Sequence, residues 1–289
     1  MKIEKDSYSP KSQLGQIFSR LCQNKAAVLG MVVLLILLFC SIFARVIAPY
    51  DYAAQDLASK FQGPSLSHLF GTDNLGRDIF SRVVYGARIS LIVGLSSVCL
   101  AAFLGVILGA VSGYYGNVCD NIIMRAMDIL LAIPNLLLAI SIAATLGNGL
   151  GNLILAIGIG SAPGYARIVR ASILSLKDQE FIEATRSIGG NDFQIIFHHI
   201  LPNCLAPIIV QMTLGVATAI LSTASLSFIG LGIAPPTPEW GSMLSAGRQF
   251  IRDAWYVVTF PGLAIMITIF GLNLFGDGLR DALDPKLKN

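Results

Sequence analysis

The chain has 289 residues, of which 54% are hydrophobic and 13% are charged, and its mean hydropathy is +0.70. Soluble domains carry about 25% charged residues, so this composition excludes an ordinary water-soluble enzyme. The net charge of +3 is spread over several loops, which excludes the clustered basic surface of a nucleic-acid-binding protein. The five cysteines match no zinc-site, redox-pair or disulfide spacing.

Long apolar segments divide the chain into candidate membrane spans. The apolar core of a bilayer is about 30 Å thick and needs about 20 residues of helix. We therefore predict an all-α polytopic membrane protein with six transmembrane helices. The first span contains no charge and is too long and too far from the start of the chain to be a cleavable signal peptide. The predicted spans are 26–44, 89–113, 121–146, 150–166, 203–233 and 255–276.

Lys and Arg in the loops set the predicted orientation. If the N-terminus is cytoplasmic, the inner segments contain more of these residues than the outer segments. We therefore predict a multi-pass protein with both termini in the cytoplasm. Residues 1–25 form a cytoplasmic segment, 45–88 an extracytoplasmic loop, 89–277 the core domain, and 278–289 a cytoplasmic tail.

Three arginines oppose this charge bias, because it places them outside. Arg77, Arg82 and Arg88 occur among apolar residues at helical spacing. Asp78 and Arg82 are four residues apart and can form an ion pair on a helix. We expect an amphipathic helix that lies along the outer membrane surface and leads into the second span.

A polar insertion, residues 167–202, separates the fourth and fifth spans. Ser175 and Asp178 have the spacing of a capping box and predict the start of a short helix. Gly189 ends that helix, and Asn191 can cap a second one. We expect two short helices joined by a glycine corner on the cytoplasmic face. The alternative is a hairpin loop that only covers the inner ends of neighbouring helices.

The motif in this insertion resembles the EAA loop of bacterial importer permeases of the ATP-binding cassette class. It consists of Glu183-Ala184, then Gly189, then Ile200-Leu201-Pro202, and Thr185 stands where the loop usually has a second alanine. Three further motifs lie at 71–88, 235–241 and 276–285. Together the four motifs resemble the second permease subunit of the dipeptide, oligopeptide and nickel importer family.

The resemblance implies a MetI-like type I importer permease fold with cytoplasmic coupling helices. It implies that the loop docks on a cytoplasmic ATPase. The docking residues would be Glu183, Ala184, Thr185, Gly189, Ile200, Leu201 and Pro202.

The energy source is expected in partner subunits. The chain has no G-x-x-x-x-G-K-[ST] phosphate-binding loop, so it is not expected to be an enzyme or to bind a cofactor itself. ATP and Mg²⁺ would be bound by two ATPase subunits. The resemblance also implies a second homologous permease and an extracytoplasmic substrate-binding protein in the bacterial cytoplasmic membrane.

Two outer segments are the expected docking surface for the binding protein. They are the end of the 45–88 loop and the loop at 234–254. The candidate residues are Asp73, Arg77, Asp78, Glu239, Trp240 and Arg248.

Irregular or polar positions in the spans mark a candidate path. Pro134 frees the carbonyl of Leu130 in the third span, and Pro163 with nearby glycines interrupts the fourth. Close helix packing through small residues is the alternative explanation for those glycines. Asp128 and Asn273 lie near the inner ends of their spans, and Asp128 either serves as a proton or cation site or pairs with Arg125.

The sequence leaves alternatives for the substrate and for the class of protein. No metal site is predicted, because the adjacent His198 and His199 diverge by about 100° on a helix. Peptides are the expected substrate, with nickel, metal chelates or glutathione-like molecules as alternatives. A self-contained secondary transporter is the alternative of another class, although it normally needs a buried ion-coupling residue near the midplane. A membrane-embedded enzyme would need convergent polar groups at depth.

Overall fold

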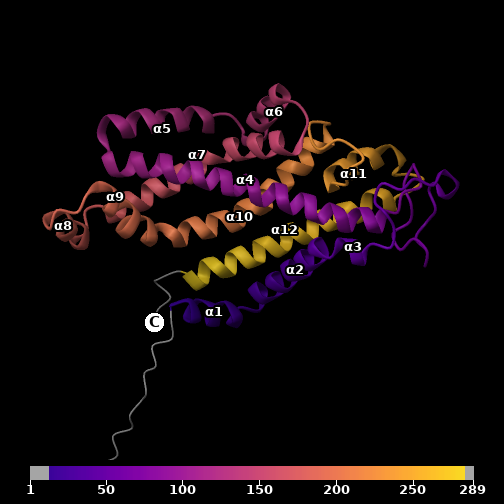
Figure 1. Ribbon diagram of the computed structural model, residues 1–289, viewed down its shortest axis with the longest axis horizontal. Helices are drawn as coiled ribbons and strands as arrows, with labels where there is room; N and C mark the ends of the chain where they lie inside the picture. The colour runs from indigo at the N-terminus through magenta and orange to yellow at the C-terminus, as the bar shows by residue number, and fades with distance from the viewer. Residues whose placement is uncertain (1–12, 284–289) are drawn as a thin grey trace, which may run out of the picture.

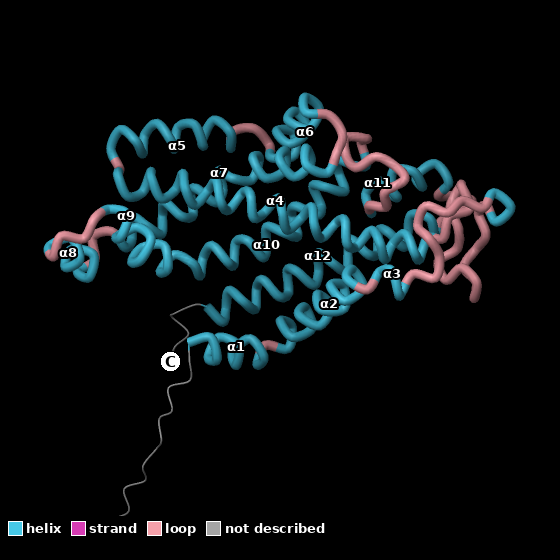
Figure 2. Tube along the Cα trace, in the orientation of Figure 1, coloured by secondary structure: helices cyan, strands magenta, loops and turns pink. Residues whose placement is uncertain are grey.

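The computed structural model describes residues 13–283, and every named element in that range is a helix (Figures 1 and 2). The predicted all-α fold class is confirmed. Residues 1–12 of the predicted N-terminal segment and 284–289 of the predicted tail lie outside the described residues.

Within the described residues, five helical segments are long and apolar enough to cross a membrane, and one bent pair can supply a sixth crossing. The five segments are α2 (Lys25–Ile42), α4 (Ile79–Tyr115), α7 (Leu150–Leu176), α9 to α10 (Asp192–Phe228) and α12 (Tyr256–Leu283). The bent pair is α5 (Asn117–Leu131) with α6 (Asn135–Leu146). The segment from α9 to α10 consists of α9 (Asp192–Gln194), the π-helical η2 (Ile195–Ile200) and α10 (Leu201–Phe228). The shorter elements are α1 (Gln13–Gln23), α3 (Ala44–Ile47), η1 (Leu57–Ser59), α8 (Glu180–Ser187), α11 (Trp240–Gly247) and η3 (Arg248–Phe250).

Helix α4 replaces the predicted amphipathic surface helix. The structure has one continuous helix, Ile79–Tyr115, where we expected a surface helix followed by a separate span. Its 37 residues extend over about 55 Å, which is longer than the apolar core of a bilayer. Arg82, on the first turn of α4, is buried. Arg82 has partners inside the protein, so this segment packs into the protein as the start of α4 and is not a separate surface helix.

The predicted third span is broken. Helix α5 ends before Pro134, and α6 begins at Asn135, with a bend of 90° between the two helices. The carbonyl of Leu130 that Pro134 was expected to free accepts a hydrogen bond from the backbone N–H of Ile133. Proline therefore ends a helix at this position and does not merely kink one.

The predicted interruption of the fourth span is wrong. Helix α7 runs without a break through Pro163 and continues to Leu176, ten residues into the segment predicted as part of the cytoplasmic insertion. Small residues instead allow close packing, the alternative explanation. A Cβ on Gly105 or Gly109 of α4 would lie within 3 Å of α7 atoms, at Tyr165 and Ala166 respectively.

Two remaining helices complete the membrane-spanning group. Helix α10 starts slightly before the predicted start of the fifth span and ends slightly before its predicted end. Helix α12 extends beyond the predicted end of the sixth span by about two turns. Helix α12 packs against α2 at Gly30 and Gly271, each of which leaves no room for a Cβ. Asn24 caps α2, because its side chain accepts from the backbone N–H groups of Ala26 and Ala27.

The helices run between two distinct ends (Figure 1). One end holds α1, α8, α9 and the C-terminal ends of α4 and α12. The other end holds α3, α11 and the loop between α3 and α4, coloured as loop in Figure 2. We call them the α8 end and the α11 end.

Candidate coupling site

The predicted two-helix insertion is present at the α8 end (Figure 1). Helix α8 ends at Ser187, and Gly189 follows with φ +86°, a left-handed conformation that disfavours side chains. The Asn191 side chain accepts a hydrogen bond from the backbone N–H of Gln194 at 2.8 Å and caps the second helix. The predicted glycine corner and second cap are therefore confirmed.

The predicted capping box is wrong. Ser175 lies inside α7 and donates its hydroxyl to the carbonyl of Ser172. The residue at the N-cap of α8 is Gln179, and its side chain makes no capping hydrogen bond. Helix α8 is instead fastened by packing.

One side chain fixes α8 to the rest of the protein. Ile182 is fully buried, and it packs in a group that we call the inner cluster. Ile173 of α7 and Ile200 of η2 belong to the same group. The complete inner cluster is Ala110, Val169, Ile173, Ile182, Ile195, Ile196, Ile200, Cys204 and Ile208.

The opposite side of the insertion exposes apolar residues. Ile188 has 86% of its surface exposed, and Phe181 is also exposed. Phe193 and Phe197 are exposed after the corner, and their ring centroids are 4.4 Å apart. Exposed apolar surface of this kind, next to polar helix residues, marks an interaction site.

Polar contacts complete the insertion. The hydroxyl of Tyr114, on the last turn of α4, donates to the carboxylate of Asp192 at 2.6 Å. A hydrogen bond with Tyr114 raises the pKa of Arg186, which is on α8. The insertion is thus connected to α4 as well as to α7 and α10.

The motif residues divide into two groups. Glu183, Ala184 and Gly189 are exposed, and the hydroxyl of Thr185 donates to the carbonyl of Phe181 at 2.8 Å. Ile200 is buried in the inner cluster, Leu201 packs against it, and Pro202 lies in the first turn of α10. The structure brings both groups together through the contact of α8 with η2.

Most of the predicted docking residues at the α11 end are buried. Five of the six predicted residues are buried, and Arg248 is exposed. The guanidinium of Arg248 lies over the ring of Phe228, 5.4 Å from the ring centroid. The buried residues are Asp73, Arg77, Asp78, Glu239 and Trp240.

The buried aspartates hold the outer segment against α4. The guanidinium of Arg77 donates to Asp73 at 2.7 Å, and Arg82 lies 3.8 Å from the same carboxylate. Asp78 does not pair with Arg82, contrary to our prediction. It caps α4 by accepting from the backbone N–H of Ser81 at 2.7 Å, and it also contacts His68 at 2.9 Å.

Glu239 and Trp240 have a comparable structural function. Glu239 caps α11 by accepting from the backbone N–H groups of Gly241 and Ser242, each at 2.8 Å. Burial raises the pKa of Glu239, and these hydrogen bonds act in the opposite direction. The indole of Trp240 donates to the carbonyl of Val83 at 3.0 Å, which fastens α11 to α4.

The four predicted path residues differ in exposure and in their partners. Asp128 is exposed and pairs with Arg167 at 2.7 Å, and not with Arg125. Pro163 is buried, while Asn273 is exposed. Pro134 is exposed and occupies the N-cap position of α6.

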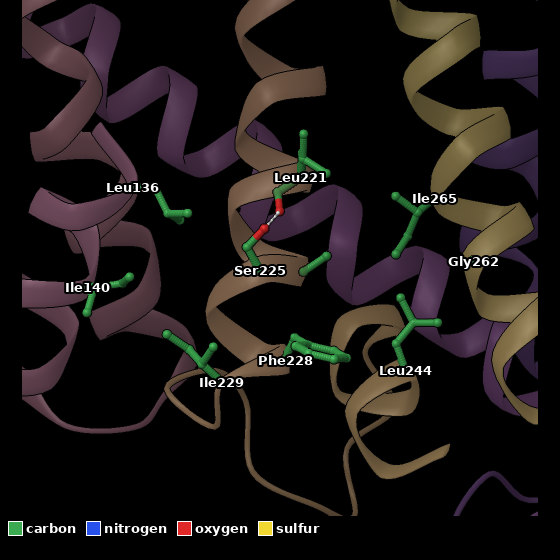
Figure 3. Close-up of a pocket in the computed structure, with 10 residues that line it drawn as sticks. Leu136, Ile140, Leu221, Ser225, Phe228, Ile229, Leu244, Gly262 and Ile265 are labelled. Carbon is green, nitrogen blue, oxygen red and sulfur yellow. Dashed lines mark hydrogen bonds between the residues drawn. The ribbon is translucent and has the colours of Figure 1, made fainter. Parts of the chain in front are cut away.

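An apolar cavity of about 380 Å³ lies between α6, α10, α11 and α12 (Figure 3). Ser225 contributes a hydroxyl to the lining of the cavity, and this hydroxyl donates to the carbonyl of Leu221. The lining residues are Leu136, Ile140, Leu221, Ala224, Ser225, Phe228, Ile229, Leu244, Gly262 and Ile265. Because α6 supplies Leu136 and Ile140, the break at Pro134 helps to shape the cavity, although Pro134 does not line it.

Sequence reasoning missed a carboxylate that joins three helices. Asp120 of α5 accepts from Arg170 of α7 at 2.5 and 2.6 Å, and from the hydroxyl of Ser112 of α4 at 2.5 Å. The only available signal was an aspartate and an arginine near the ends of two predicted spans. Those residues are 50 positions apart, so their spacing gave no sign of a contact.

Two family models match the chain. One is described as "Binding-protein-dependent transport system inner membrane component" and matches residues 105–289. The other is described as "N-terminal TM domain of oligopeptide transport permease C" and matches residues 12–64.

Curated relatives match along nearly the whole chain. The dipeptide transport system permease protein DppC of Alkalihalophilus pseudofirmus is 50% identical, covering 98% of this chain and 93% of that protein. The di/tripeptide transport system permease protein DppC of Pseudomonas aeruginosa is 46% identical, covering 96% and 94%. The glutathione transport system permease protein GsiD of Escherichia coli is 48% identical, covering 94% and 90%.

A solved structure shares the fold. An inward-facing structure of the MetNI methionine ABC transporter aligns with a TM-score of 0.57 and 19% identity, covering 71% of this chain and 98% of the matched chain. The predicted MetI-like fold is therefore confirmed. The chain belongs to the family of binding-protein-dependent transport system inner membrane components, and it is a permease subunit of an ATP-binding cassette importer.

Proposed function

We propose that this permease forms, with a second homologous permease, the membrane path of an importer for dipeptides and related short peptides. The observation that carries the proposal is the 50% identity to a dipeptide permease along 98% of the chain. The substrate arrives from an extracytoplasmic binding protein, as the description of the matched family model suggests.

The exposed side of α8 is the docking site for a cytoplasmic ATPase subunit. Phe181 and Ile188 supply the apolar contacts, and Glu180 and Glu183 supply acidic groups in the first turn. Two ATPase subunits bind ATP and Mg²⁺, and one of them holds α8. Movement of α8 then displaces α7, α4 and α10, which it reaches through Ile182 and the polar contact of Tyr114.

Both termini and α8 lie on the cytoplasmic side of the bacterial inner membrane. This orientation is supported by the Lys and Arg bias of the sequence. It also agrees with the position of α1, α8 and the end of α12 at the same end of the molecule (Figure 1).

The apolar cavity in Figure 3 is part of the peptide path. A cavity with this lining accepts an apolar side chain, while the peptide backbone needs polar partners elsewhere. Glutathione is a second candidate substrate, because a glutathione permease is 48% identical to this chain. Nickel and metal chelates are left with no specific observation in their favour.

Transport by the complex isolated from native membrane tests the proposal. The complex is reconstituted into proteoliposomes with ATP enclosed, and the extracytoplasmic protein fraction of the same cells is supplied outside. Radiolabelled dialanine should accumulate only when ATP is enclosed. Accumulation of labelled glutathione but not dialanine would favour the second candidate, and ATP-independent accumulation would contradict an importer driven by ATPases.

A further inference from the structure

The last turn of α4 is fastened to the segment that follows the glycine corner. Tyr114 donates its hydroxyl to Asp192 at 2.6 Å. Asp192 is the first residue of α9 and comes three residues after Gly189. This contact therefore reaches the C-terminal side of the α8 insertion, and it spans 78 positions of the sequence.

The same turn of α4 is fastened to the segment that precedes α8. Ser112 donates to Asp120 at 2.5 Å, and Asp120 also holds the guanidinium of Arg170 through two hydrogen bonds at 2.5 and 2.6 Å. A bidentate arginine–carboxylate pair fixes orientation as well as distance. Arg170 is six residues before the end of α7, and α7 leads directly to α8.

A second ion pair between α5 and α7 lacks this connection. Arg167 and Asp128 are both more than half exposed, and their contact at 2.7 Å involves no atom of α4. Exposed pairs of this kind contribute little energy. The Asp120 contact differs, because one carboxylate joins α4, α5 and α7 at the base of the insertion.

The far end of α4 is also fixed by polar groups. Asp78 caps its first turn, and Arg82 lies 3.8 Å from the buried carboxylate of Asp73. Helix α4 therefore connects the α8 end with the buried ion cluster at the α11 end. A rigid helix with discrete contacts at both ends can transmit a displacement between them.

We propose that Ser112, Tyr114 and Asp120 are positioning residues that transmit the movement of α8 to α4, and through α4 to the α11 end of the permease. This inference rests on the proposed function, because it requires that an ATPase moves α8. The two sides of the insertion then act on the same turn of α4, so that α8 and α4 move as one body. Without the hydroxyl of Tyr114, one of these two polar connections is lost, and α4 follows the movement of α8 less closely.

A pair of adjacent tyrosines supplies a matched test. Tyr114→Phe removes the hydroxyl that binds Asp192 and Arg186, and it keeps the ring that packs against the inner cluster. Tyr115→Phe is the control, because Tyr115 is exposed and its hydroxyl has no hydrogen-bond partner within residues 13–283. Both variants are isolated as complete complexes and reconstituted, and the measured quantity is peptide transported per ATP hydrolysed.

We expect Tyr114→Phe to bind as much ATPase as wild type and to lower peptide transported per ATP roughly two- to thirtyfold, the range of a single coupling contact. Tyr115→Phe should match wild type. Asp192→Asn retains an oxygen that can accept from Tyr114 and should keep most of the coupling, whereas Asp192→Ala should resemble Tyr114→Phe. A merely structural contribution would lower the yield of complex and leave the ratio unchanged.

Three results separate the possible failures. A wild-type ratio in both Tyr114→Phe and Asp192→Ala overturns the inference and leaves the importer proposal intact. A lowered ratio in Tyr115→Phe equal to that in Tyr114→Phe also overturns it. A wild-type complex that carries no ATPase, or that transports no peptide or glutathione, overturns the proposed function and this inference with it.

Discussion

At the scale of single residues, the sequence could suggest aspartate–arginine pairs but could not show which of them form. Two aspartate–arginine pairs have the i,i+4 spacing, Asp73 with Arg77 and Asp78 with Arg82. The first pair forms at 2.7 Å. The second does not, because the helix starts at Ile79 and Asp78 serves as its cap. Spacing alone could not show where the helix begins.

The buried pair should be important for stability. Asp73→Asn leaves the guanidinium groups of Arg77 and Arg82 buried without their carboxylate. We expect it to lower the free energy of unfolding by roughly 3 kcal/mol, because removal of one partner leaves an uncompensated buried charge. The measurement is thermal unfolding of the detergent-solubilised protein, followed by tryptophan fluorescence.

An exposed pair provides the comparison for that experiment. Asp128→Asn removes the partner of Arg167, where both side chains are more than half exposed. Its effect on stability should stay below about 1 kcal/mol. Equal losses in both variants would contradict the assignment of Asp73 as the centre of a buried charge cluster.

At the scale of elements, α8 was predictable and its attachment was not. The glycine corner and the cap at Asn191 are local signals that depend on neighbouring residues. The attachment depends on Ile182, which packs against residues of α7 and η2. Whether Phe181 or Ile182 points inward is decided by those distant helices, so the sequence of α8 alone does not specify it.

Release of that attachment should be visible by hydrogen exchange. Ile182→Ala removes the fully buried side chain that connects α8 to the inner cluster, a change that costs roughly 2–5 kcal/mol in packed cores. We expect the amides of 180–187 to lose protection while those of α10 keep theirs. Phe181→Ala, at an exposed position, is the control and should leave protection unchanged. Normal protection in Ile182→Ala would show that other contacts hold α8.

Two prolines had opposite effects that the sequence did not distinguish. Helix α5 stops before Pro134, and the chain bends by 90° there. Helix α7 continues through Pro163. Proline removes one backbone hydrogen bond in either case, and packing against neighbouring helices decides whether the helix continues. For α7 this packing comes from α4, where Gly105 and Gly109 allow close approach.

The cavity shaped by α6 can be filled by a substitution at Gly262. A Cβ at Gly262 would meet only the side chain of Leu244, at 3.8 Å, so a larger residue fits without a clash at its first atom. We expect Gly262→Leu to lower the uptake of diphenylalanine at least about tenfold relative to diglycine, because it occupies space for an apolar side chain. Competition between the two labelled peptides in proteoliposomes measures this ratio.

A second glycine controls for the effect of adding a side chain to a helix. Gly151 of α7 has no atom within 4 Å of an added Cβ, and it does not line the cavity. Gly151→Leu should leave the ratio of the two peptides unchanged. If Gly262→Leu also leaves it unchanged, the cavity is not part of the path.

At the scale of the whole molecule, the sequence predicted the membrane class and the family. The structure showed that several residues expected at a docking surface are buried. Apolar runs of about 20 residues are visible without any tertiary information. The docking residues expected at the α11 end, such as Asp73 and Trp240, were polar or aromatic residues in outer loops, and they proved to be buried. Residues of a motif can thus be structural supports for a surface as well as parts of it.

The two ends of the molecule carry different sets of contacts. The α11 end is held together by buried ion pairs and caps. The α8 end exposes apolar residues next to the polar contacts of the insertion. These exposed residues fit a permease that receives mechanical work at α8.

Co-purification of an ATPase with this permease tests whether α8 is the coupling site. Ile188 is 86% exposed, so Ile188→Asp should not disturb the fold, and a double variant, Glu183→Lys with Gly189→Asp, alters the motif itself. Leu66, fully exposed in the outer segment, supplies the control Leu66→Asp. We predict that wild type and Leu66→Asp retain an ATPase and a second permease after detergent extraction, while both α8 variants lose most of the ATPase. Equal recovery of ATPase with all four proteins, or with none, would contradict the assignment of α8 as the coupling site.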